Sequence, residues 1–286
     1  MKNFDGSSSS NYYTVTHPEE FHINWKAFYE KADELTTATR ESVPNELDIP
    51  YGDHPKQRLD LYAPKEKSSG WPVFVFFHGG GFREGDRAEY GFVASPFVHH
   101  NILTVAAGYR LTPSFRYPDA HDDARHALAW VFRNIAAHGG DPDRIYVGGH
   151  SSGANLSAFV SVKTDWLEQM SLPTDMIKGC APVSTSYDLR VPTWVREYLP
   201  DPELRGEASP ILNIETVPRK TVVGVGSLEE KAGRVKSSKE FVRTLKERGG
   251  EAELVLLEGC EHDVTALATG DEGSELFQTI RRMFDS

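Results

Sequence analysis

One serine stands in a pattern that is typical of a catalytic nucleophile. Ser151 is the centre of a Gly-x-Ser-x-Gly pattern that runs from Gly149 to Gly153. An apolar run precedes the pattern and a helix-like stretch follows it, so we expect a sharp turn between a strand and a helix. Such a turn exposes the hydroxyl beside the start of a helix, where negative charge is stabilised. The pattern therefore predicts a serine that takes part in acyl transfer.

A glycine-rich segment earlier in the chain is the candidate for holding the negative charge of that reaction. The segment from His78 to Phe82 contains three consecutive glycines directly after an apolar run. Glycines let backbone amides approach a ligand closely, and we expect the amides of Gly80, Gly81 and Ser152 to form an oxyanion hole. A phosphate-binding loop is excluded, because no Gly-Lys-Ser/Thr follows. We interpret His78 as a residue that holds the loop.

The serine needs a base, and one of the 11 histidines stands where a base is required. His262 follows the last strand-like run, and parallel strands present their carboxyl ends at one edge of a sheet. Three acids remain candidates for its partner: Glu229 is the first, Glu230 the second and Asp188 the third, because each follows a strand-like run. The acid would fix the tautomer of His262 and stabilise its imidazolium form.

Large side chains near these groups are candidate walls of a substrate pocket: Phe82, His150, Trp194, Tyr198 and Val264. The bulk of Phe82 beside the oxyanion segment predicts a small acyl pocket. Trp194 and Tyr198 belong to an insertion near residues 187–213 that lacks clean alternation of strands and helices, and we interpret it as a lid or pocket wall. We therefore expect a small, partly apolar substrate.

The elements that must position these groups alternate along the chain. Residues 46–50 and 58–62 alternate polar and apolar side chains, which predicts an antiparallel hairpin. Continuously apolar runs follow, as expected of strands that are buried on both faces: 72–77, 102–107, 145–147, 177–183, 221–225 and 253–257. Helical patterns lie between most of them, at 119–137, 154–163, 232–248 and 274–284. This order predicts a mostly parallel sheet with helices on both faces.

The start of the chain is expected to be a tail and a cap helix, within residues 1–45. Residues 18–41 carry an amphipathic helical pattern, whose apolar face must cover either the active site or the partner in a homodimer. Residues 46–286 are expected to form a single catalytic domain. The first ten residues contain no apolar core of a signal peptide, and no apolar run approaches the ~20 residues of a membrane span.

The composition excludes several classes of protein. The net charge is −11, and no Lys/Arg cluster offsets it, which argues against nucleic acid and anionic membranes as partners. The two cysteines, Cys180 and Cys260, do not have metal-type spacing and do not form a disulfide framework. We expect a cytoplasmic protein that needs neither a metal ion nor a cofactor.

The motifs together resemble two branches of the α/β-hydrolases. The segments 78–82, 109–113 and 141–144 are similar to the hormone-sensitive-lipase type, and the segments 51–64, 149–153 and 225–229 are similar to kynurenine formamidases. The resemblance covers residues from about 45 to the end. It implies the α/β-hydrolase fold and the nucleophile Ser151, the acid Glu229 and the base His262, with oxyanion amides from Gly80, Gly81 and Ser152.

The chain departs from both branches at positions that shape the pocket. His150 precedes the nucleophile where the lipase type usually has Asp, and Gly80-Gly81-Phe82 replaces the Gly-Gly-Tyr-Trp of the formamidases. Asp263 follows the base where both branches favour Phe.

The first functional hypothesis is a serine hydrolase that cleaves carboxylic esters with short to medium acyl chains. The alternative is an arylformamidase that hydrolyses aryl formamides such as N-formylkynurenine. A ligand receptor with a dead triad ranks last, because Ser151 and His262 are both present.

Overall fold

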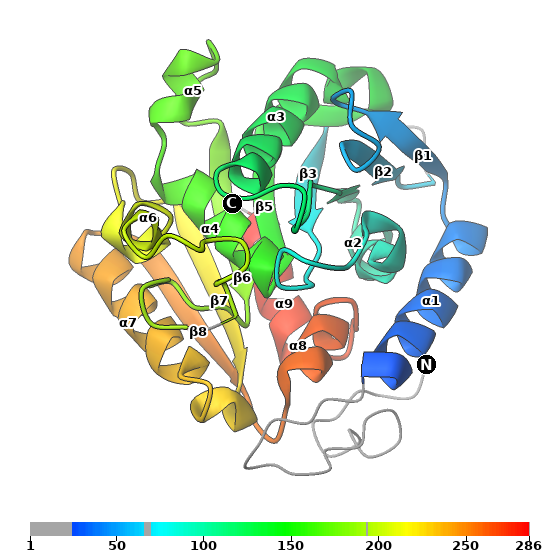
Figure 1. Cartoon of the computed structure of the whole chain (residues 1–286). Coiled ribbons are helices and arrows are strands. Elements are labelled where there is room, and N and C mark those ends of the chain that lie inside the picture. The colour runs from blue at the N-terminus through cyan, green and yellow to red at the C-terminus, as the bar shows by residue number, and fades with distance from the viewer. Residues whose placement is uncertain (1–24, 66–69, 193, 286) are drawn as a thin grey trace.

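A twisted sheet of eight strands forms the centre of the protein, and helices cover both of its faces (Figure 1). The computed structural model describes residues 25–65, 70–192 and 194–285. The strand order across the sheet is β1-β2-β4-β3-β5-β6-β7-β8. The pairs β1–β2 and β2–β4 are antiparallel, and the pairs from β4 to β8 are parallel. The mostly parallel sheet and the initial hairpin are therefore confirmed.

The strands lie close to the predicted runs, except that β5 extends well beyond the predicted run 145–147 at both ends. Their bounds are β1 (Asn45–Pro50), β2 (Arg58–Tyr62), β3 (Trp71–Phe77), β4 (Leu103–Ala107), β5 (Gly140–His150), β6 (Ile177–Val183), β7 (Lys220–Gly226) and β8 (Glu251–Leu257). Alternate side chains of β3 pack into different cores: Val73 and Val75 on one face of the sheet, Phe74 and Phe76 on the other. This two-sided burial explains why the run is continuously apolar.

Two groups of helices make the outer layers. One face is covered by α3 (Asp119–Asn134), α4 (Ser152–Val162) and α7 (Arg234–Glu247). The other face is covered by α2 (Ala94–His99), α8 (His262–Thr269) and α9 (Glu275–Arg281), together with α1 (Trp25–Ser42). The predicted helix at residues 18–41 thus continues to Ser42, and its first part lies outside the described residues. In the described part of the chain, no helix is both long and apolar enough to cross a bilayer.

The segment from residue 187 to 213 contains only short helical turns among its described residues. It follows β6 and includes α6 (Leu204–Glu207), whereas α5 (Asp165–Gln169) precedes that strand. Tyr198 and Leu199 are fully buried in the same apolar core as α3 and α4. This part of the insertion therefore belongs to the apolar core.

The turn between β5 and α4 depends on a very close approach to β3. A Cβ atom on Gly153 would lie 2.1 Å from the carbonyl oxygen of Phe77 and 2.4 Å from that of His78. A Cβ atom on Gly149 would lie 2.4 Å from the backbone of Gly153. Ser151 between them has a φ of 56°, in the left-handed region. Both glycines are required because the backbones pass too close for any side chain.

We therefore expect Gly153→Ala to lower the free energy of unfolding by about 2 kcal/mol or more, because backbone atoms of β3 must move to admit the methyl group. Urea unfolding followed by circular dichroism measures this change. Gly206→Ala in α6 is the matched control, since a Cβ atom there meets nothing within 4 Å. The control should be neutral or stabilising by up to about 1 kcal/mol. Equal unfolding midpoints for the two variants would contradict the prediction.

Candidate active site

Three residues singled out in the sequence meet at the carboxyl edge of the sheet. Ser151 lies between β5 and α4, His262 begins α8, and Glu229 lies in the 3₁₀ turn Ser227–Glu230 after β7. The His262 Nε2 atom is 2.9 Å from Ser151 Oγ, and its Nδ1 atom is 2.7 Å from Glu229 Oε2. Because a carboxylate can only accept, Nδ1 donates its hydrogen to Glu229. Nε2 then carries the lone pair that can take a proton from the serine hydroxyl.

The structure separates the three candidate acids. Glu229 is fully buried against His262, whereas Glu230 is exposed beside it. The carboxylate of Asp188 instead accepts three hydrogen bonds from the guanidinium of Arg190, the shortest of them at 2.7 Å. Of the three candidates, Glu229 alone is within hydrogen-bond distance of the histidine ring.

The buried charge of Glu229 is surrounded by donors. Ser184 Oγ donates to its Oε1 atom at 2.6 Å, and the Gly226 amide donates to the same atom at 3.0 Å. Arg234 Nη1 lies 3.4 Å from its Oε2 atom. Burial by itself would raise the pKa of Glu229, but the facing His262 ring, Arg234 and the hydrogen bonds lower the pKa to about 2. The acid is therefore ionised at neutral pH.

Burial and the charge of Arg234 both affect the pKa of His262, the candidate base. Together they lower the pKa of His262 below its usual value of 6.5, although Glu229 acts in the opposite direction. A histidine with a lowered pKa is uncharged at neutral pH, so its Nε2 atom is free to accept a proton. Arg234 was not singled out in the sequence analysis. Its place five residues after the candidate acid was the available signal.

A chain of buried polar groups supports the acid and the base from behind. His150 Nε2 donates to the carbonyl oxygen of His262 at 2.8 Å, and Thr265 Oγ1 donates to the same oxygen at 2.7 Å. The Thr265 hydroxyl also lies 2.7 Å from Ser184 Oγ, which contacts Glu229. These contacts fix the histidine ring relative to its acid. Sequence reasoning missed Ser184 and Thr265, although each lies at the sheet edge where sites form.

The glycine segment after β3 forms a tight turn beside the serine. Gly80 and Gly81 have φ values of 125° and 63°, and both line the cavity next to Ser151. The amides of Arg83 and Glu84 each donate to the Gly80 carbonyl at 3.0 Å, which closes the turn. No acceptor among the described residues takes a hydrogen bond from the amides of Gly80 or Gly81. These amides are available to a ligand, as is expected of an oxyanion hole.

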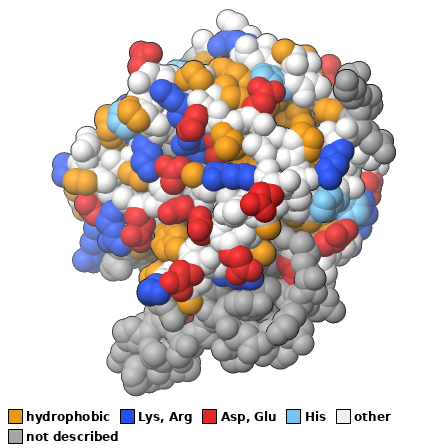
Figure 2. Space-filling model, turned by 90° about the vertical axis from the view of Figure 1, so that its right-hand side faces the viewer, with side chains coloured by type: hydrophobic (Ala, Val, Ile, Leu, Met, Phe, Trp, Pro, Cys, Tyr) orange, Lys and Arg blue, Asp and Glu red, His pale blue; other side chains and the backbone are white. Residues whose placement is uncertain are grey.

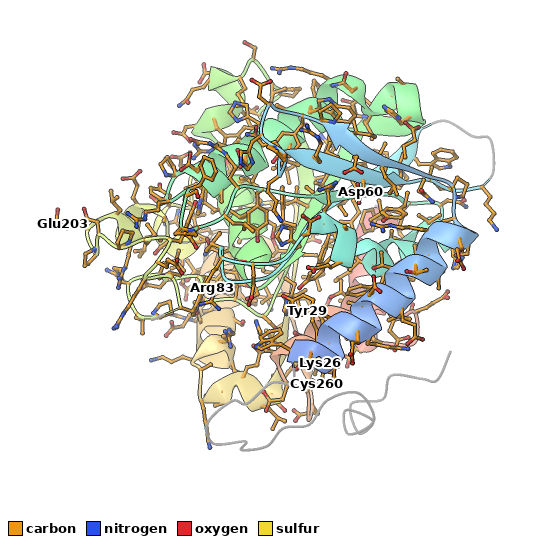
Figure 3. All side chains as sticks on the ribbon, turned by 45° about the vertical axis from the view of Figure 1, so that its right-hand side comes forward. Lys26, Tyr29, Asp60, Arg83, Glu203 and Cys260 are labelled. Carbon is orange, nitrogen blue, oxygen red and sulfur yellow. The ribbon has the colours of Figure 1, made fainter. Side chains whose placement is uncertain are left out.

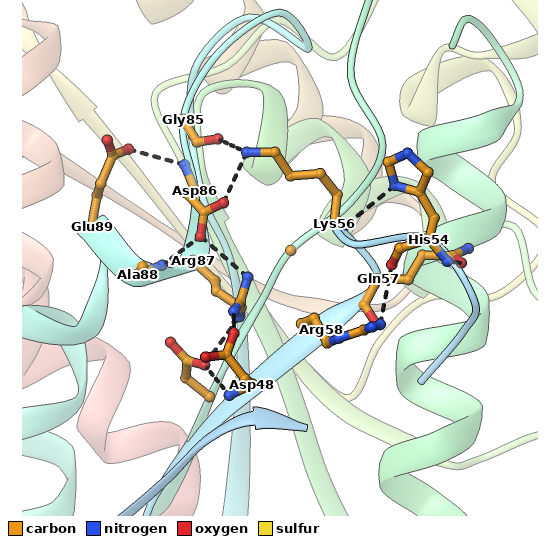
Figure 4. A network of polar contacts seen from close by, with 12 residues as sticks. Asp48, His54, Lys56, Gln57, Arg58, Gly85, Asp86, Arg87, Ala88 and Glu89 are labelled. Carbon is orange, nitrogen blue, oxygen red and sulfur yellow. Dashed lines mark hydrogen bonds and ion pairs between the residues drawn. The ribbon is translucent and has the colours of Figure 1, made fainter. Parts of the chain in front are cut away.

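A network of ion pairs connects the segment after this turn to the hairpin of β1 and β2 (Figure 4). Lys56 Nζ donates to Asp86 at 2.8 Å, and Arg87 Nε donates to the buried Asp60 of β2 at 3.0 Å. Arg87 also contacts Asp86 and Asp48. Asp60 and the Arg87 side chain are almost completely buried, so removing either of them would leave a buried charge without this partner, which is costly. The network thus holds the segment that carries the candidate oxyanion amides.

A cavity of about 610 Å³ opens onto Ser151 and His262. Its volume is in the usual range for small-molecule sites. Four aromatic residues contribute to its walls: Trp25, Tyr29, Tyr90 and Trp194. Figure 3 shows Tyr29 on α1 on the same side of the molecule as Arg83 of the glycine turn. The centroids of the Trp25 and His262 rings lie 6.1 Å apart, and the rings meet edge to face, so α1 lies beside the site. The alternative expectation, that this helix covers the partner in a homodimer, stays a prediction.

Two of the five predicted wall residues, His150 and Trp194, line this cavity. Phe82, Tyr198 and Val264 do not, contrary to the expectation from the sequence. The Phe82 and Tyr198 rings stack 4.1 Å apart and are fully buried behind the glycine turn. Val264 points into the core from α8 and has no exposed surface. These side chains support the walls from behind without facing a ligand.

Two further carboxylates are buried beside the base. Glu261 and Asp263 flank His262 in the chain, each is about 1% exposed, and none of their carboxylate oxygens has a hydrogen-bond partner among the described residues. Burial raises the pKa of Asp263 to about 7 and also raises that of Glu261. Among the described residues, no group of three or more His, Cys, Asp or Glu side chains is arranged to hold a metal ion.

Comparisons with known proteins agree with this architecture. A kynurenine formamidase of Salmo salar is 33% identical over 168 residues, which cover 58% of this chain and 55% of that protein. A probable isoprenylcysteine alpha-carbonyl methylesterase of Oryza sativa subsp. japonica is 28% identical over 240 residues, covering 74% and 56%. The chain thus spans about half the length of the curated relatives it matches.

Solved structures and a family model identify the fold. A hyperthermophilic esterase from Pyrobaculum calidifontis superposes with a TM-score of 0.74 at 22% identity, over 91% of both chains. A family model described as the alpha/beta hydrolase fold matches residues 74–266, which is more than half of the chain. This match confirms the resemblance carried by the sequence motifs, and the chain belongs to the α/β-hydrolase fold family.

Proposed function

We propose that the protein is a serine hydrolase that cleaves carboxylic esters with short to medium acyl chains. The observation that carries the proposal is the continuous line of hydrogen bonds from Ser151 through His262 to the buried Glu229, beside an aromatic cavity. Relatives named as esterases support it, since they include the methylesterases and a carboxylesterase of Mycobacterium tuberculosis that is 40% identical over 102 residues.

The reaction would proceed in two halves. Ser151 Oγ forms a bond to the ester carbonyl carbon while its proton passes to His262 Nε2, and the amides of Gly80, Gly81 and Ser152 hold the oxyanion. His262 then gives this proton to the leaving oxygen as the ester bond breaks. Water then attacks the acyl-enzyme in the same way, with His262 as the base. This second half-reaction releases the carboxylic acid product and restores Ser151. Glu229 stays ionised throughout and stabilises the imidazolium.

The second candidate is an arylformamidase. The similarity to kynurenine formamidases favours it. An aromatic amine is weakly basic and leaves more easily than an alkyl amine, so the same three residues serve both reactions. The choice is tested by comparing purified protein on 4-nitrophenyl esters and on N-formylkynurenine. An ester-specific enzyme leaves N-formylkynurenine untouched, whereas turnover of this formamide at a higher kcat/KM than that of the esters would replace the first proposal by the second.

We expect a fluorophosphonate probe to modify Ser151, and mass spectrometry of the peptides locates the adduct. Ser151→Ala should abolish labelling and lower kcat by about 10⁴ or more. Glu229→Ala should lower kcat by about 10² to 10⁴, because the base loses its orientation. Glu230→Ala is the control, since this neighbouring carboxylate is exposed. Full activity of Glu229→Ala would refute the assigned acid.

We expect the activity to persist in mildly acid solution, because the pKa of His262 is lowered and the free base survives below pH 6.5. Arg234→Met removes a positive charge near the ring, which makes the imidazolium easier to form and raises the pKa of His262. The acid limb of the kcat/KM profile should therefore move to higher pH. Arg243→Met, on the exposed side of the same helix, is the control and should leave the limb in place. Superimposable profiles for all three proteins would contradict this electrostatic effect.

A further inference from the structure

The described residues that line the cavity include more cations than carboxylates, although the whole protein is acidic. The chain has a net charge of −11, and the face seen in Figure 2 carries acidic and basic side chains interspersed. Among the described residues that line the cavity, by contrast, three are cationic, Arg83, Lys231 and Arg234, and one is a carboxylate, Glu84. Cations are therefore concentrated at the place where a substrate would enter.

The three cations differ in how far they are already neutralised. Arg234 contacts the buried Glu229, and its charge acts on the acid and the base. Arg83 forms an exposed pair with Glu84 at 3.6 Å, a type of contact that contributes little energy. Lys231 is exposed and forms no ion pair with any described residue. Lys231 and Arg83 thus have charge available to a bound anion, from two separate segments of the chain.

The rest of the lining suits an aromatic or apolar body. Trp25 and Tyr29 contribute from α1, Trp194 from the insertion, and Tyr90 from the segment after the glycine turn. Val191 at the same cavity is 81% exposed, an apolar side chain without cover. Aromatic walls contribute contact area to a flat ring, while cations add charge attraction and speed the encounter.

We propose that this site selects anionic substrates, in which a carboxylate is attached to an aromatic or apolar body, and that Lys231 and Arg83 are the residues that confer this selectivity. The inference rests on the proposed hydrolase function and narrows its substrate class. The carboxylate of such a substrate lies near Lys231 and Arg83, and its ester carbonyl lies at Ser151. Neutral esters of the same shape are poorer substrates because they lose the charge attraction.

The test compares two esters of equal shape, 3-acetoxybenzoate and the neutral 3-acetoxybenzamide. The ratio of their kcat/KM values should be about tenfold in favour of the benzoate at low salt, and it should fall as added salt screens the charges. Lys231→Gln and Arg83→Gln should each reduce the ratio about threefold, and the double variant should bring it close to one. Lys239→Gln is the matched control, because Lys239 is an exposed lysine of α7 that does not line the cavity. An identical ratio in the wild type and the double variant overturns the proposal.

A binding measurement separates this inference from the proposed hydrolase function. If neither these two esters nor the 4-nitrophenyl esters are cleaved, the ester hydrolase proposal fails, and calorimetric titration with 3-hydroxybenzoate and 3-hydroxybenzamide decides the anion selectivity alone. If the wild type binds the benzoate more tightly than the benzamide, and the double variant does not, the result supports the role of Lys231 and Arg83. Equal binding of the two compounds refutes it.

Discussion

A carboxylate without contact to solvent requires partners for its charge, and much of the candidate active site is arranged around that requirement at Glu229. The partners come from different elements: Ser184 follows β6, Gly226 ends β7, Arg234 starts α7 and His262 starts α8. The acid can be satisfied only when these elements have packed together. The same contacts that stabilise the buried charge also orient the histidine toward the serine, so folding and the geometry of the site are coupled.

Much of the fold could be predicted from the sequence because its signals are local. A strand buried on both faces is continuously apolar, and a turn that no side chain can enter requires glycine, as Gly153 shows. Ser151 and His262 could be selected because the carboxyl ends of parallel strands share one edge. Glu229 could be ranked but not separated from Glu230, since adjacent residues on a turn differ in burial only through tertiary packing.

The walls of the cavity were harder to predict, because a sequence does not tell on which side of a loop a large side chain points. Phe82 turns away from the cavity and stacks on Tyr198, more than a hundred residues later, whereas Trp25 reaches the site from α1. The net charge of the chain also gave no information about the charges at the cavity. An acidic composition argues against polyanionic partners, but it averages over the whole surface and says nothing about the few side chains at one opening.

Two buried carboxylates beside the candidate base have no hydrogen-bond partner among the described residues, and such burial costs stability at this edge of the sheet. Glu261 and Asp263 take up buried positions at the start of α8 where amides or apolar side chains would avoid the cost of desolvation. A protein with such positions is less stable than its sheet and cores would allow. Directed evolution for heat resistance would accordingly select changes beside His262, the candidate base, where each gain in stability also changes the electrostatic field around its ring.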